Sequence, residues 1–259
     1  MDAIVIAGGL PQPGDPLYPF TAGIPKAMLD ICGKPMVQWV LDALNQAELV
    51  ERVVIVGMEP DSNLVSAKLE RYVPDHGGIL ENIRAGVKVA LEINPGGVHM
   101  AVVSADIPAI LPEQVDWIIQ SAMQTDNDLY YNVVKREVME KRFPGSNRSY
   151  VRLKDMEVCG GDLNVVRAQA VTGNDALWQK IVNARKNALK QAALVGFDIL
   201  FLLLLRQLTL QSGVEKVTRR INISGKALIC PYAEAAMDVD KPHQLELMRA
   251  DLARRIQAQ

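Results

Sequence analysis

The N-terminal stretch Met1–Ala43, MDAIVIAGGLPQPGDPLYPFTAGIPKAMLDICGKPMVQWVLDA, decides the fold of this protein. Its short apolar run Ala3–Ala7 predicts a buried strand, which ends at Gly8-Gly9. Glycine has no Cβ, so a ligand can approach its backbone closely, and consecutive exposed N–H groups form a concave site for an anion. After a proline-rich loop the chain reaches Lys26, whose charge we expect beside the same glycines. The stretch therefore predicts a site for the phosphates of a nucleoside triphosphate.

The glycine pair alone is a weak signal, because paired glycines also mark ordinary tight turns. The stretch contains neither the P-loop pattern G-x-x-x-x-G-K-[ST] nor the dinucleotide fingerprint G-x-G-x-x-G. The order of its pieces, a strand, a glycine loop, a returning lysine and a helix, is more specific than the glycines.

Downstream, apolar runs alternate with helical patterns. Val53–Gly57 and Met100–Asp106 are typical of buried strands, and we expect helices over Val37–Ala47, Asp61–Arg71 and Ile79–Ile93. A β-α-β-α order favours a parallel sheet joined by right-handed crossovers. The sequence therefore predicts an α/β protein whose sheet lies between helices.

Asp106 ends the third of these strands and is followed by Ile107-Pro108. In open α/β sheets the carboxyl ends of the strands form the edge where ligands bind. A carboxylate at this point can cap the next helix, which we expect to begin near Pro112. It can also bind Mg²⁺, which prefers one or two carboxylates together with phosphate oxygens and water.

A second acidic pair lies near the C-terminus, in the segment Ala236–Leu245, AMDVDKPHQL. In an extended segment Asp238 and Asp240 point to the same side, and two like charges there repel each other unless a cation lies nearby. Asp240 before Lys241-Pro242 is also a good helix opening. The two interpretations can hold together.

Five segments resemble the nucleotidyltransferases of the GT-A fold, which include the MobA-like molybdenum-cofactor guanylyltransferases, the methylerythritol phosphate cytidylyltransferases and the sugar-phosphate nucleotidyltransferases. They are Ala7-Gly8-Gly9, Pro25-Lys26-Ala27-Met28-Leu29, Gly33-Lys34-Pro35-Met36, the strand that ends at Asp106, and Asp238-Val239-Asp240-Lys241-Pro242. The resemblance implies a Rossmann-like, three-layer α/β/α sandwich with a mixed, mostly parallel sheet. It also implies a single domain over residues 1–259, with an acceptor-side insertion at about 136–210.

The resemblance further assigns roles to individual residues. Lys26 and Asp106 are the expected catalytic residues. Mg²⁺ is the expected cofactor, and its ligands would be Asp106 and Asp240, with Asp238 behind or alongside. The expected nucleotide-binding residues are Ala7, Gly8, Gly9, Lys26, Gly77, Gly78 and Asn82. The expected acceptor-binding residues are Gly161, Asp162 and Asn164, although Asp162 stands where the family usually has asparagine.

Two parts of this assignment have alternatives. Gly77 and Gly78 could form an ordinary turn before an exposed helix face, and their neighbour His76 is better read as solvent-exposed than as catalytic. In the first loop, Pro16 falls where the family usually has an arginine that faces the triphosphate, and Leu10–Ile24 contains no Lys or Arg. Either backbone amides and Lys26 contribute more to binding than usual, or triphosphate binding is weaker.

A group of polar residues, Arg148, Tyr150, Arg152 and Lys154, lies on or beside an expected strand over Ser149–Lys154. These side chains could meet an anionic acceptor. For any single one of them, the solvated face of a hairpin is the better expectation.

The apolar run Ile199–Leu205 (ILFLLLL) follows an expected helical region, Thr172–Ala193. It is too short to span a bilayer, which needs about 20 residues. We favour a helix buried in the core. The alternatives are a dimer interface, which would make the protein a homodimer, or a lid over an apolar acceptor.

The composition excludes several classes of protein. A net charge of −2 argues against a nucleic-acid-binding surface. Three cysteines far apart in the sequence, Cys32, Cys159 and Cys230, indicate reduced thiols rather than disulfides or a zinc site. No basic segment precedes the first apolar run, as it would in a signal peptide, so we expect a cytoplasmic location.

The expected function is Mg²⁺-dependent nucleotidyl transfer from a nucleoside triphosphate to a small phosphorylated acceptor, with release of pyrophosphate. Three alternatives stay open. A GT-A type glycosyltransferase would consume a nucleotide sugar, a non-catalytic protein would bind nucleotide without turnover, and a structural or interaction protein would bind none.

Overall fold

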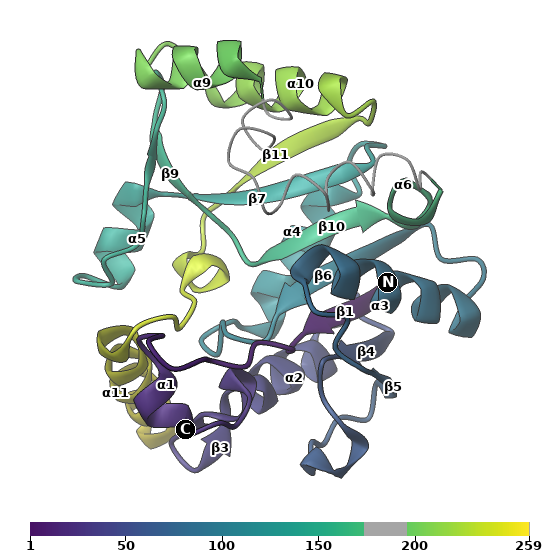
Figure 1. Ribbon diagram of the computed structural model, residues 1–259, viewed down its shortest axis with the longest axis vertical. Coiled ribbons are helices and arrows are strands. Elements are labelled where there is room, and N and C mark those ends of the chain that lie inside the picture. The colour runs from purple at the N-terminus through teal and green to yellow at the C-terminus, as the bar shows by residue number, and fades with distance from the viewer. Residues whose placement is uncertain (174–195, 259) are drawn as a thin grey trace.

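A mixed sheet of nine strands forms the centre of the protein in a computed structural model that describes residues 1–173 and 196–258 (Figure 1). The strand order is β5-β4-β1-β6-β10-β7-β9-β8, and β11 pairs with the other edge of β7. Only β9 and β10 run against the common direction of the described strands. The strands are β1 (Asp2–Ile6), β4 (Arg52–Val56), β5 (Leu69–Val73), β6 (His99–Ser104), β7 (Leu129–Lys135), β8 (Val151–Arg152), β9 (Glu157–Gly160), β10 (Leu163–Arg167) and β11 (Gly225–Cys230).

The first strand, β1, lies in the interior of the sheet, where it pairs in parallel with β4 on one side and β6 on the other. Its side chains alternate between the two faces of the sheet, as in any strand. Ala3 and Val5 belong to the core on one face and Ile4 to the core on the other, and all three are fully buried. A strand buried on both faces reads as a continuous apolar run, which explains why the sequence signal was clear.

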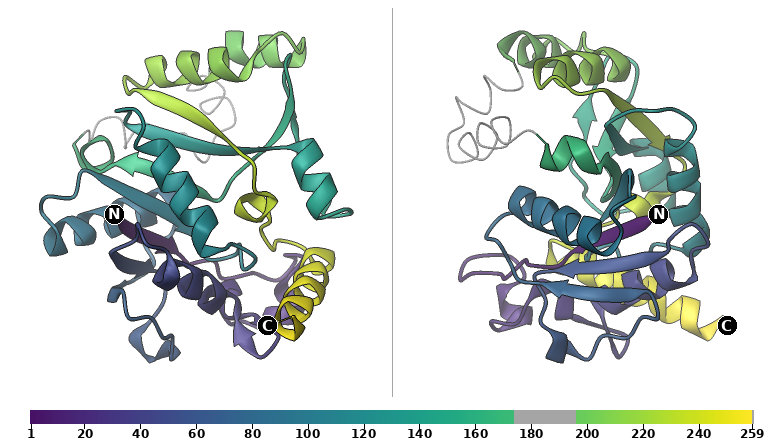
Figure 2. Two further views of the ribbon diagram at one scale, coloured as in Figure 1. Left: turned by 180° about the vertical axis from the view of Figure 1, so that it is seen from behind. Right: turned by 90° about the vertical axis from the view of Figure 1, so that its right-hand side faces the viewer.

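Helices cover both faces and complete three layers (Figure 2). α2 (Met36–Gln46) and α4 (Pro112–Ala122) pack on the face of Val5, while α3 (Ile79–Ile93) and α6 (Ala168–Thr172) pack on the face of Ile4. The predicted three-layer α/β/α sandwich with a mostly parallel sheet is therefore confirmed. The remaining helices are α1 (Tyr18–Thr21), α5 (Arg136–Arg142), α9 (Phe197–Leu204), α10 (Leu210–Arg220) and α11 (Pro242–Gln257), with single 3-10 turns η1 (Lys26–Met28), η2 (Pro60–Ser62) and η3 (Ala233–Ala236). Two short strands, β2 (Asp30–Ile31) and β3 (Lys34–Pro35), form a separate hairpin.

The helix expected over residues 61–71 is wrong. The turn η2 is followed by an extended chain and then by β5, which lies parallel to β4. Val65, which the helix would have turned inward, is 75% exposed. At this edge of the sheet, the backbone of β4 finds hydrogen-bond partners in β5. That pairing outweighs a local helical spacing.

The apolar run near residue 200 does form a helix, α9, but the expectation that it is buried in the core is wrong. Phe201 and Leu204 are 60% and 78% exposed, and Leu200 and Leu205 are also exposed. Among the helices of the described residues, none is both long and apolar enough to cross a membrane. Most of the expected helical region Thr172–Ala193 lies outside the residues that the structure describes.

Candidate active site

The chain after β1 lies so close to the chain after β4 that both need glycine at the point of contact. Gly57, directly after β4, has a φ of +90°, and a Cβ there would lie 2.2 Å from the Cα of Gly8. A Cβ on Gly8 would in turn lie 2.6 Å from Oδ1 of Asp75. Gly57 is not among the site residues predicted from the sequence. The glycine that ends an apolar strand is the signal that could have found it.

Backbone hydrogen bonds beside this contact also position Lys26. Its N–H donates to the carbonyl of Gly9 at 2.8 Å, while the N–H of Ala7 donates to the carbonyl of Val56 at 2.8 Å. The chain therefore returns to the glycine pair at Lys26, as predicted, and contacts it directly through the backbone.

A cavity of about 310 Å³ opens at this point, at the carboxyl edge of the sheet. Its lining comes from the end of β1, the 75–79 loop before α3, and the end of β6. It contains every residue that we predicted to bind nucleotide, together with Asp106: Ala7, Gly8, Gly9, Lys26, Gly77, Gly78 and Asn82.

Asn82 in α3 holds the loop of residues 75–78 in place. Its Oδ1 accepts a hydrogen bond from the backbone of His76 at 2.7 Å, and its Nδ2 donates to Asp75 Oδ1 at 2.6 Å. The side chain is buried, whereas His76 is exposed, as expected. Asn82 therefore shapes the wall of the cavity through the loop that carries Gly77 and Gly78.

Lys26 joins two carboxylates that are far apart in the sequence. Its Nζ lies 2.5 Å from Oδ2 of Asp106 and 2.7 Å from Oδ1 of Asp240. Burial alone would lower the pKa of Lys26, but Asp106 and Asp240 more than offset this, so the pKa is raised. The backbone supports the arrangement, because Val239 N–H donates to the carbonyl of Asp106 at 3.0 Å.

Asp238 has a different partner. It forms an ion pair with Arg148, whose Nη2 lies 3.6 Å from Oδ2 of Asp162. The Arg148 side chain is only 13% exposed, whereas Arg152 is exposed and pairs with Glu157, and Tyr150 donates to Glu140 at 2.8 Å. Of the four polar residues in this stretch, the structure therefore brings Arg148 into the site. Sequence analysis could not single it out, because its partners come from distant segments.

Burial raises the pKa of Asp162 to about 7, Asp106 adds to this effect, and Arg148 opposes it. The other two predicted acceptor residues have structural contacts. Asn164 accepts from the backbone of Asn132 at 2.8 Å and donates to the carbonyl of Gly161 at 3.1 Å. A Cβ on Gly161 would lie 2.8 Å from Cγ of Asn132. Asp162 is thus the member of this set beside the charged cluster.

The three carboxylates predicted to bind metal are therefore divided between two cations. Asp106 and Asp240 share Lys26, while Asp238 is held by Arg148. Within residues 1–173 and 196–258, no group of three or more His, Cys, Asp or Glu side chains is placed to hold a metal ion. The buried Oδ1 of Asp106 has no hydrogen-bond partner in that part of the chain.

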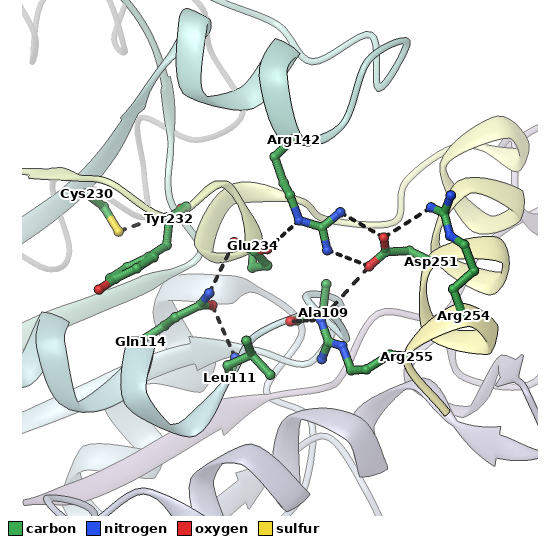
Figure 3. Close-up of polar contacts among 10 residues, drawn as sticks. All are labelled: Ala109, Leu111, Gln114, Arg142, Cys230, Tyr232, Glu234, Asp251, Arg254 and Arg255. Carbon is green, nitrogen blue, oxygen red and sulfur yellow. Dashed lines mark hydrogen bonds and ion pairs between the residues drawn. The ribbon is translucent and has the colours of Figure 1, made fainter. Parts of the chain in front are cut away.

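A second charged network holds the segment that carries Asp238 and Asp240 (Figure 3). Arg142 in α5 binds both carboxylate oxygens of Asp251 in α11 at 2.8 Å, and its Nε donates to Glu234 in η3 at 2.7 Å. We call these three residues the Arg142 clamp. Because η3 precedes the segment and α11 follows it, the clamp fixes both of its ends.

The neighbours of the clamp also bind α4 and the loop that leads into it. Gln114 in α4 donates to Glu234 at 3.2 Å, and Arg255 in α11 donates to the carbonyl of Ala109 at 2.9 Å. Oε1 of Gln244 accepts from the backbone of both Asp240 and Lys241 at 2.9 Å. Together these contacts determine where Asp240 can lie.

Comparison with known proteins gives this geometry a context. The family model of the MobA-like NTP transferase domain matches residues 3–257. A solved structure described as a hypothetical transferase from Thermus thermophilus is 34% identical, with a TM-score of 0.80 over 94% of this chain and 98% of that one.

Two curated relatives match over shorter lengths. A probable molybdenum cofactor guanylyltransferase from Pyrococcus horikoshii is 28% identical over 46% of this chain and 54% of its own length. A probable mannose-1-phosphate guanylyltransferase 2 from Arabidopsis thaliana is 33% identical over 30% of this chain and 21% of its own length. This chain thus spans about half or less of these curated relatives.

The family match covers nearly the whole chain, and it includes Gly8, Gly57, Lys26 and the aspartates that pair with Lys26. The chain therefore belongs to the MobA-like NTP transferase domain family.

Proposed function

We propose that this protein is a Mg²⁺-dependent nucleotidyltransferase that transfers a nucleoside monophosphate from a nucleoside triphosphate to a small phosphorylated acceptor and releases pyrophosphate. One observation carries the proposal. A single cavity gathers the glycine backbone of the β1 end, the glycine loop before α3, and Lys26 beside Asp106. Its volume of about 310 Å³ is in the range of small-molecule sites.

Backbone donors and an ammonium group suit the phosphates. The N–H groups near Gly8 and Gly9 would donate to phosphate oxygens, and Lys26 would stabilise the charge on the α-phosphate and the leaving pyrophosphate. Both curated relatives are named guanylyltransferases, so GTP is the first nucleotide to test.

The charges of the site suit a metal. Three carboxylates, Asp106, Asp238 and Asp240, face two cations, Lys26 and Arg148, which leaves a formal excess of one negative charge even when Asp162 is protonated. Oδ1 of Asp106 has no hydrogen-bond partner among the described residues, and a carboxylate oxygen is the kind of ligand that Mg²⁺ prefers. Asp106 and Asp240 would hold the ion, and when bound it would neutralise phosphate charge.

The remaining residues act by position and charge. Arg148 lies beside Asp162, one of the expected acceptor-binding residues, and it would orient an acceptor phosphate. A phosphate oxygen is already ionised near pH 7. The reaction therefore needs no general base from the protein, and alignment supplies most of the rate enhancement.

The test combines binding with turnover. We expect GTP to raise the melting temperature in a Mg²⁺-dependent manner, and pyrophosphate to form when a phosphorylated acceptor is added. Lys26→Met and Asp106→Asn should each lower turnover about 100- to 1000-fold without loss of the fold. Lys34→Met, which removes a half-buried lysine paired with Asp42, is the matched control and should retain activity.

Three results would contradict the proposal. Turnover of a nucleotide sugar without pyrophosphate would indicate a glycosyltransferase. Nucleotide binding without turnover on any phosphorylated acceptor would indicate a binding protein, and the absence of binding by all four triphosphates would indicate an interaction role.

A further inference from the structure

An apolar groove of about 410 Å³ lies between helix α10 and the sheet. Figure 1 shows α10 beside β11, at the end of the molecule away from α11. The sheet side of the groove consists of Leu129, Val133 and Val158, and the helix side of Leu210, Val214 and Val217. The volume is typical of ligand pockets, which are mostly apolar with a few polar groups at one point.

One end of the groove reaches the charged cluster of the candidate active site. Gly160 lines the groove, and its carbonyl accepts a hydrogen bond from Arg148 Nη2 at 3.4 Å. Tyr131 also lines the groove, and a Cβ on Gly160 would lie 2.3 Å from its hydroxyl oxygen. Burial and the nearby Asp162 raise the pKa of Tyr131, in agreement with a hydroxyl between the apolar lining and the charges.

The lining is thus mostly apolar, with Thr209, Thr218 and Lys226 as its polar members. The cation Arg148 is hydrogen-bonded to the lining residue Gly160. This pattern matches an amphiphile with an anionic head and an apolar chain. A free sugar phosphate or another fully polar acceptor would leave the valine and leucine lining in contact with water, without the gain from apolar burial.

We propose that the groove binds the apolar chain of the acceptor, and that the acceptor is an alkyl or isoprenoid monophosphate whose phosphate faces Arg148. This inference rests on the proposed nucleotidyl transfer and specifies its substrate class. An oxygen of the acceptor phosphate attacks the α-phosphorus and forms a new P–O bond. The bond from the α-phosphorus to the oxygen that bridges to the β-phosphate breaks, and pyrophosphate leaves with that electron pair. The product is a nucleoside diphosphate ester of the apolar chain.

The test is a chain-length series. The affinities of ethyl, butyl, hexyl and octyl phosphate are measured by calorimetry on the full chain, at concentrations where each is monomeric. We expect about fourfold tighter binding for each added methylene group, because burial of one methylene contributes about 0.8 kcal/mol. Octyl phosphate with GTP and Mg²⁺ should also release pyrophosphate faster than ethyl phosphate.

Two groove variants localise the effect. Val151 lines the groove from β8 and is 46% exposed, so Val151→Asp should fold. Val214→Asp places a charge on the helix side. Each should weaken octyl phosphate at least tenfold and leave ethyl phosphate unchanged, whereas Val65→Asp, at a valine that does not line the groove and is 75% exposed, should change neither.

The outcomes separate this inference from the proposed function. Equal affinity along the series, or unchanged octyl phosphate binding in both groove variants, overturns the groove assignment, even if GTP binds and short acceptors react. Chain-length-dependent binding without any GTP binding overturns the acceptor role and the proposed function together. A dimer that Val214→Asp dissociates, with no dependence on chain length, shows that a second copy occupies the groove and also overturns the inference.

Discussion

Two basic side chains divide the four carboxylates of the candidate site between them. Lys26 holds Asp106 and Asp240, and Arg148 holds Asp238 and lies 3.6 Å from Asp162. Apart from Asp238 and Asp240, which share the segment between η3 and α11, the members come from different parts of the chain, so the cluster exists only in the folded protein. Burial, with an added contribution from the charge of Asp106, raises the pKa of Asp162 in this cluster to about 7.

We predict that Asp162→Asn changes the pH dependence of stability. Between about pH 4 and pH 7 the folded protein keeps a proton on Asp162 that the unfolded chain releases, because the pKa of about 7 in the fold exceeds the ordinary value of 3.8. The free energy of unfolding therefore falls as the pH rises through this window and is flat above it. Asparagine does not titrate, so the variant should not lose this part of its stability as the pH rises.

The measurement is urea denaturation of both proteins from pH 5 to pH 8. The variant should gain stability relative to the wild type as the pH rises, and the gain should level off above pH 7. A constant difference between the two proteins across this range would show that Asp162 does not titrate there.

At the scale of elements, the position of Asp240 depends on three helical segments that are far apart in the sequence. α5, η3 and α11 meet in the Arg142 clamp (Figure 3), and the segment between η3 and α11 carries Asp238 and Asp240. Glu234 and Asp251 are 9% and 8% exposed in their side chains. Two buried carboxylates without their arginine would repel each other and lack solvation.

We predict that Arg142→Met lowers the free energy of unfolding by about 3 kcal/mol, because it leaves two buried charges without a partner. It should also weaken Mg²⁺-dependent GTP binding, since the ends of the segment that carries Asp240 are released. Chemical denaturation and calorimetry measure the two effects.

Arg136→Met is the matched control. Arg136 lies on the same helix and pairs with Glu157 at an exposed position, where solvent screens the ion pair and its loss should change the free energy of unfolding little. Equal losses of stability in the two variants would contradict the role of the clamp.

At the scale of the whole molecule, α9 presents an apolar face to solvent. Leu200, Phe201, Leu204 and Leu205 are between 37% and 78% exposed. Contiguous exposed apolar surface of this kind marks interaction sites.

We predict that the protein forms a homodimer through this face of α9. Sedimentation velocity should show an association that depends on concentration, and the double substitution Phe201→Glu and Leu204→Glu should abolish it by placing like charges at the contact. Val98→Glu, at an exposed valine directly before β6, should leave the association unchanged. A wild-type protein that stays monomeric across the micromolar range would rule out the dimer.

The sequence by itself determined the central part of the fold. β1, β4 and β6 are buried on both faces, so their apolar runs are local signals that need no partner to be read. Gly8, Gly9 and Asp106 were predicted for a similar reason, because each follows closely on such a strand, whereas the roles of Lys26 and Asp240 were assigned from the resemblance to a known family. The cavity does contain the seven predicted nucleotide-binding residues, although their role in binding remains a prediction.

Only the tertiary structure decided what lies at the edges and between distant segments. β5 replaced an expected helix because it pairs with β4, and α9 lies on the surface although its sequence resembles a core helix. Arg148 and Arg142 acquired their roles from carboxylates that lie up to 109 residues away in the sequence. A residue's neighbours across the fold set its burial, its charge partners and its pKa, and sequence patterns report only what repeats along the chain.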